Sequence, residues 1–182
     1  LHAHEIQPLL AVLAMLAMTL RGLALVPQQP VAGSVLAAFG TALAFLAGGI
    51  GALLATAPLF PLVMMLSADC RTPRASGALL LGLCLALTLA ALWPLAVHLN
   101  QPEQLGLWLR DEWARLSGPG LSGGEVVRGL ELLGWFTWPL WPIVLWSLWR
   151  ARRTIGQLRW LLPLLSAVLV LSHFVIRGDL SQ

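Results

Sequence analysis

The sequence predicts an all-α protein, a polytopic bundle of about six transmembrane helices with an outer loop that contains an interfacial helix. The chain has 182 residues, of which 58% are hydrophobic and 10% charged, and its mean hydropathy is +0.82. These values lie outside the range of soluble globular proteins. Apolar runs long enough to cross about 30 Å of hydrocarbon follow one another along the chain. They are apolar on every face, whereas the strands of a membrane barrel alternate polar and apolar residues.

The first predicted span, residues 9–26, ends at a linker that contains Pro27. Residues 35–66 then form an apolar stretch that is too long for one untilted crossing. Because Gly48 and Gly49 interrupt this stretch and two prolines follow them, we expect two short spans joined by a tight turn at these glycines. One tilted span is the alternative.

Three further spans are predicted at residues 77–97, 130–149 and 160–176. The second of them holds five tryptophans and two prolines. Tryptophans near the ends of a span are typical of an aromatic belt at the membrane interface. The Trp-Pro pairs lie deeper, where proline bends a helix, so this span could also form the wall of a cavity.

Arginines in short loops predict the orientation, because cytoplasmic loops carry an excess of basic residues. Arg71 and Arg74 mark residues 67–76 as cytoplasmic, and four arginines mark residues 150–159. Two spans separate these loops, so both lie on the same side. The loop at residues 98–127 is then the outer, periplasmic loop.

Within the outer loop, residues 102–116 read as an amphipathic helix that lies along the membrane interface. Leu105, Trp108 and Leu109 recur at helical spacing. Asp111 and Arg115 are four residues apart, which predicts an ion pair on the helix surface.

The formal charge of +3 is carried by dispersed arginines without a continuous basic face, so we expect no nucleic-acid partner. His2, His4 and Glu5 have metal-ligand chemistry but do not converge as ligands at helical spacing would, so no metal site is predicted. Cys70 and Cys84 fit neither a zinc site nor a disulfide framework. Phosphate loops, nucleophile elbows and dinucleotide fingerprints are missing from the sequence.

Three stretches, taken in order, resemble the membrane region of bacterial polyprenyl-phosphate-dependent glycosyltransferases, the superfamily of protein mannosyltransferases and the lipid A aminoarabinose transferase. They are GTALAFLAGGIGALLATAPL at 40–59, WPLAVHLNQPEQLGLWLRDEWARLSGPG at 93–120 and LGWFTWPLWPIVLWSLWR at 133–150. The first is similar to a glycine-rich helix that turns sharply, although Gly48 stands where relatives commonly have lysine. The second is similar to a Trp-Pro helix end followed by an outer loop with tryptophan, arginine and glycine.

The resemblance implies an enzyme of the bacterial inner membrane that moves a sugar from a polyprenyl-phosphate donor to a lipid, glycan or protein acceptor on the outer face. Residues 1–182 would be one membrane domain, a fragment of a longer protein whose catalytic aspartate lies upstream of Leu1. We therefore assign no catalytic residue within the chain. The cofactor is not assigned, and a divalent metal is one candidate.

Arg115 matches the family's loop arginine, and a guanidinium is well suited to a donor phosphate. Arg110, Glu112 and Trp113 complete the expected substrate-binding set on the same helix. The alternative class is a transporter subunit or a non-enzymatic membrane scaffold. Transporters tend to show internal repeats and charges in mid-span, whereas the charges here cluster at the ends of spans.

Overall fold

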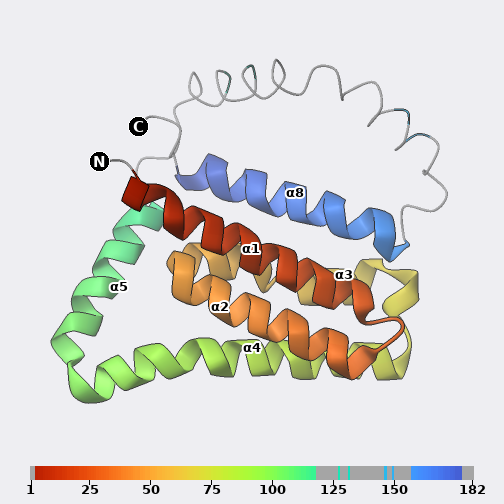
Figure 1. The fold of residues 1–182 in the computed structure, drawn as a ribbon, viewed down its shortest axis with the longest axis horizontal. Helices are drawn as coiled ribbons and strands as arrows, with labels where there is room; N and C mark the ends of the chain where they lie inside the picture. Colours follow the sequence, from red (N-terminus) through yellow and green to blue (C-terminus); the bar gives the residue numbers. More distant parts are fainter. Residues whose placement is uncertain are drawn as a thin grey trace.

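The computed structural model describes residues 3–117 and 157–177, together with the single positions 127, 131, 146 and 149. Throughout these residues the regular structure is helical, so the predicted all-α class is confirmed (Figure 1). Most of the predicted span 130–149, and residues 118–126 of the outer loop, lie outside the described residues. The elements are α1 (Ala3–Leu25), α2 (Pro30–Thr56), α3 (Leu59–Leu66), the 3-10 turn η1 (Ala68–Cys70), α4 (Pro73–Asn100), α5 (Pro102–Ser117) and α8 (Leu158–Arg177).

The chain reverses direction inside α2, at Gly49. This residue has φ 70° and ψ −157°, which no helix accommodates and which glycine adopts readily. Ala37 before the turn and Phe60 after it therefore belong to the same buried cluster, and the segment that leads into α3 runs in the opposite direction to the first half of α2 (Figure 1). The predicted tight turn at Gly48 and Gly49 is confirmed.

Two stretches in the described part of the chain are long and apolar enough to cross a membrane, Pro30–Leu66 and Pro73–Asn100. Leu10–Leu25 and Trp160–Leu169 are apolar but shorter. Because Gly49 reverses the chain, Pro30–Leu66 is not one straight rod. Its two halves each measure roughly 25 to 28 Å at about 1.5 Å per residue.

Helices α1 and α2 pack closely because glycines line their contact. A Cβ added at Gly33 would lie 2.7 Å from the carbonyl oxygen of Gly22, and one at Gly40 would lie 2.7 Å from the backbone nitrogen of Thr19. Further along, a Cβ at Gly48 would lie 2.7 Å from the side chain of Val12. Small residues that let two backbones approach are typical of helix pairs in membranes.

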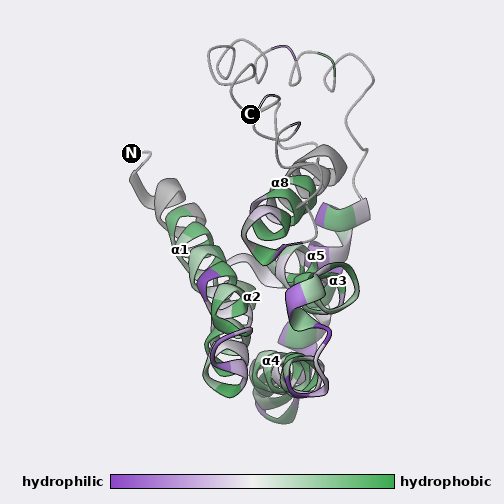
Figure 2. Cartoon of the chain, turned by 90° about the vertical axis from the view of Figure 1, so that its right-hand side faces the viewer, coloured by the Kyte–Doolittle hydropathy of each residue, from purple (hydrophilic) through white to green (hydrophobic). Residues whose placement is uncertain are grey.

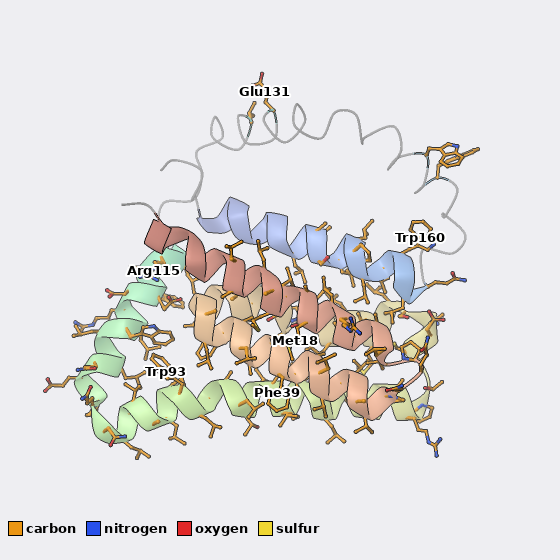
Figure 3. All side chains as sticks on the ribbon, in the orientation of Figure 1. Met18, Phe39, Trp93, Arg115, Glu131 and Trp160 are labelled. Atoms are coloured by element: carbon orange, nitrogen blue, oxygen red, sulfur yellow. The ribbon has the colours of Figure 1, made fainter. Side chains whose placement is uncertain are left out.

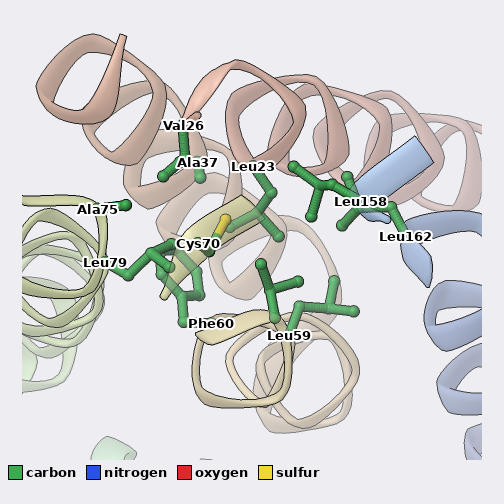
Figure 4. Close-up of a cluster of buried hydrophobic side chains, with 11 residues drawn as sticks. Leu23, Val26, Ala37, Leu59, Phe60, Cys70, Ala75, Leu79, Leu158 and Leu162 are labelled. Atoms are coloured by element: carbon green, nitrogen blue, oxygen red, sulfur yellow. The ribbon is translucent and has the colours of Figure 1, made fainter. Parts of the chain in front are cut away.

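A cluster of buried apolar side chains holds the end of the bundle opposite the Gly49 turn (Figure 4). There Cys70 and Leu158 lie in one cluster with residues of α1, α3 and α4. The Asp69 carboxylate accepts a hydrogen bond of 2.9 Å from the backbone N–H of Leu158, at the first turn of α8. The loop marked by Arg71 and the start of α8 therefore meet at one end of the bundle, which we call the Asp69 end.

Apolar residues predominate along the helices, as the hydropathy colouring of the ribbon in Figure 2 shows, and many large apolar side chains are exposed. On α4, small residues such as Gly82, Ala86 and Ala90 face the neighbouring helices, whereas Leu81 and Leu92 are exposed. The exposed face of α4 is thus as apolar as its packed face. Exposed apolar surface of this extent is typical of contact with a membrane or with another protein.

Candidate functional site

Helix α5 lies across the end of the bundle where the Gly49 turn is, and we call this the α5 end (Figure 1). Non-helical backbone at Gln101, with φ −149° and ψ 72°, ends α4, and Pro102 starts α5 at once. Pro102 suits this position because the first turn of a helix needs no N–H donor. The predicted helix at 102–116 is confirmed.

Trp108 anchors α5 to two other helices. Its ring meets Trp93 of α4 edge to face, with ring centroids 4.9 Å apart, and meets Phe45 of α2 at 6.1 Å. Such aromatic pairs add stability beyond the area that they bury. The contacts fix α5 against the helix that precedes the Gly49 turn and against the end of α4.

Glu112 lies one helical turn beyond Trp108 and points into the bundle. Its side chain is only 3% exposed, and its Oε2 accepts a hydrogen bond of 3.2 Å from the backbone N–H of Ile50. The first N–H groups after a helix break have no partner within the helix, so a carboxylate is a natural acceptor there. Gly49 leaves room for the carboxylate, because a Cβ on Gly49 would lie 2.7 to 2.8 Å from its atoms.

Arg115 forms an ion pair with Glu112, at 3.1 Å between Nη1 and Oε1. The predicted pair of Asp111 with Arg115 is wrong, because Arg115 turns instead toward the buried acid three residues before it. The Arg115 side chain is 65% exposed. A guanidinium has five N–H groups, more than one carboxylate oxygen uses, so Arg115 keeps donors for a second anion.

The other two residues of the predicted substrate-binding set lie apart from this pair. Arg110 is exposed, and Trp113 is 70% exposed on a different side of α5 from Arg115. The structure thus brings Glu112 and Arg115 together and leaves Arg110 and Trp113 on the surface of the same helix. The sequence did not indicate that Phe45 and Trp93 contact Trp108 and thereby hold α5 against the bundle.

Figure 3 shows Arg115 and Trp93 at the same end of the bundle, with Trp160 at the opposite end. The site therefore combines an exposed cation with the end of a long apolar surface.

Over the described residues, no group of three or more His, Cys, Asp or Glu side chains could hold a metal ion. The side chains of His2, His4 and Glu5 lie outside the described part.

Comparisons with protein families, with curated proteins and with solved structures find no match to this chain.

Proposed function

We propose that this chain is part of an integral membrane glycosyltransferase that moves a sugar from a polyprenyl-phosphate donor to a lipid, glycan or protein acceptor. The observation that carries the proposal is the Arg115 guanidinium, exposed at the end of an apolar bundle and held there by the buried Glu112. A lipid-linked phosphate sugar has an anionic head beside a long apolar tail. A cation at the edge of an apolar surface complements both parts.

We propose a membrane arrangement of six spans for the bundle. They are α1, the two halves of Pro30–Leu66, α4, the span predicted at residues 130–149, and α8. The apolar outward faces support contact with lipid. Arg21, Arg71 and Arg74 are exposed toward the Asp69 end, which favours that end as cytoplasmic. The α5 end then faces the outside of a bacterial inner membrane.

The charge and exposure of the side chains on α5 suggest a separate role for each of them in the proposed enzyme. Arg115 would bind the donor phosphate, and Arg110 and Trp113 would contact the headgroup region from the surface of α5. Both Glu112 oxygens accept hydrogen bonds within the protein, so Glu112 is a poor general base. The proposal therefore gives Glu112 no catalytic role.

The test uses the full-length protein supplied with a polyprenyl-phosphate sugar, with transfer measured at matched protein abundance. Arg115→Ala should lower transfer by about 10- to 100-fold, the worth of a charged hydrogen bond. Arg115→Lys should restore little, because an ammonium lacks the guanidinium fork. Arg74→Ala removes the same charge at the opposite end and should stay within about twofold of wild type.

Normal transfer by Arg115→Ala would remove Arg115 from the site, and absence of transfer in the wild type would favour a transporter subunit or scaffold.

A further inference from the structure

Glu112 is the one buried charged side chain among the residues whose side chains the structure describes. The other charged residues of α5, from Glu103 to Arg115, are exposed. Burying a carboxylate is costly unless both charge and hydrogen bonds are satisfied. Here both requirements are met, by the Ile50 N–H on one oxygen and by Arg115 on the other.

One carboxylate therefore joins two separate elements. Oε2 binds the backbone after the Gly49 turn, at a sequence separation of 62 residues, and Oε1 binds the guanidinium of Arg115 on α5 itself. Since Ile50 belongs to α2, directly after the turn, Glu112 links the guanidinium to the bundle as well as to α5. A free arginine on a helix surface would instead sample many rotamers.

We propose that Glu112 is a positioning residue that holds the Arg115 guanidinium over the Gly49 turn, ready for a phosphate, and that Glu112 does not itself contact the donor. The identity of the anion rests on the proposed function. Glu112 is suited to this role and unsuited to binding, because its oxygens are occupied and its charge would repel a phosphate. An arginine fixed before the ligand arrives avoids the loss of side-chain freedom on binding.

The first arm of the test needs no ligand. Phenylglyoxal modifies arginine, and peptide mass spectrometry follows Arg115 and Arg110 separately in the full-length protein. In the wild type Arg115 should react more slowly than Arg110, because Glu112 holds it. Glu112→Gln keeps an oxygen for the Ile50 N–H but removes the charge, so the Arg115 rate should rise severalfold while the Arg110 rate stays unchanged. Asp111→Asn removes the neighbouring charge in a side chain that does not pair with Arg115, and should change neither rate.

A second variant tests whether the new amide group in Glu112→Gln, rather than the loss of the bridge, changes the Arg115 rate. Glu112→Asp keeps the charge but is shorter by one methylene, so it cannot bridge Ile50 and Arg115 together. The same rise in Arg115 reactivity is expected. An Arg115 rate that is unchanged in both variants would overturn the proposal.

The second arm measures binding of a polyprenyl phosphate to the purified protein in detergent as a double-mutant cycle. Arg115→Ala and Glu112→Gln should each weaken binding by about tenfold, and the double variant should bind no more weakly than Arg115→Ala alone. Effects that multiply would show that Glu112 acts independently of Arg115, against the proposal. If the wild type does not bind polyprenyl phosphate while the first arm behaves as expected, the proposed function fails and the positioning role stands.

Discussion

Glu112 and Gly49 are in contact across the α5 end of the bundle: a Cβ added at Gly49 would lie 2.7 Å from Oε2 of Glu112. Gly49 is also the residue with positive φ in the part of the chain that the structure describes. The turn therefore requires glycine for two separate reasons, backbone conformation and space for a buried carboxylate. Gly49 thus allows the chain to reverse direction within α2 and leaves room for the Glu112 side chain of α5 to pack against the turn.

Gly49→Ala should destabilise the protein by about 1–3 kcal/mol through the positive φ alone, and further by displacing the Glu112 carboxylate. Thermal unfolding in detergent measures the loss as a lower Tm. The matched control is Gly77→Ala in α4, where an added Cβ meets nothing within 4 Å, and where alanine favours the helix by roughly 0.5–1 kcal/mol. A Tm for Gly49→Ala equal to that of the control would contradict the geometry of the turn.

The glycine-lined contact between α1 and α2 gives a second prediction. In Gly22→Ala the new methyl would meet backbone atoms of Ala37 and the carbonyl oxygen of Gly33, which cannot rotate away. The two helices must move apart, so the Tm in detergent and the yield of folded protein should fall. Gly106→Ala, on α5 with open space around it, is the control. Equal stability of the two variants would rule out close packing at Gly22.

The sequence predicted the reversal at Gly49 because local signals were sufficient: an apolar stretch too long for one crossing, interrupted by paired glycines. It also predicted α5 to within one residue at its C-terminal end, because Pro102 and the spacing of Leu105 and Trp108 are local features as well.

The partner of Arg115 could not be predicted in the same way. Spacing along a helix allows both Asp111 and Glu112, and the choice depends on which acid the bundle buries. One signal was present, because Glu112 follows Leu105 and Trp108 on the apolar stripe of α5. The hydrogen bond that Glu112 accepts from Ile50 joins two segments that are distant in the sequence. The spacing of apolar residues along one helix cannot predict such a contact.

Cys70 gives a prediction about reactivity. Burial raises the pKa of the Cys70 thiol above its ordinary value of 9.0, the neighbouring Ser67 side chain lowers this pKa in part, and the nearby Asp69 charge raises it. At pH 8 the folded protein should therefore alkylate Cys70 much more slowly than the denatured chain does, in a Cys84→Ser background. Equal rates in the folded and denatured protein would contradict the buried position.

The same shift in pKa makes a prediction about stability. Because the folded state holds the thiol proton more tightly than the unfolded state, the contribution of Cys70 is complete below pH 9 and is lost as the pH rises through the raised pKa. The fall in Tm between pH 8 and a pH above 9 should be smaller in Cys70→Ala than in the wild type. A fall of the same size in both proteins would show that Cys70 makes no such contribution.

The most direct test of the account asks whether Gly49 reverses the chain in the membrane and Arg115 faces outward. Single cysteines at Gln28, Thr72 and Glu103, in a background without Cys70 and Cys84, are exposed to a membrane-impermeant maleimide in intact cells. Gln28 and Thr72 lie on either side of the Gly49 turn, and Glu103 is an exposed residue of α5. We expect Glu103→Cys to be labelled and the other two to be protected. Labelling of Gln28→Cys with Thr72→Cys protected would mean a single crossing between them, and protection of Glu103→Cys would place Arg115 in the cytoplasm and contradict the proposed donor site.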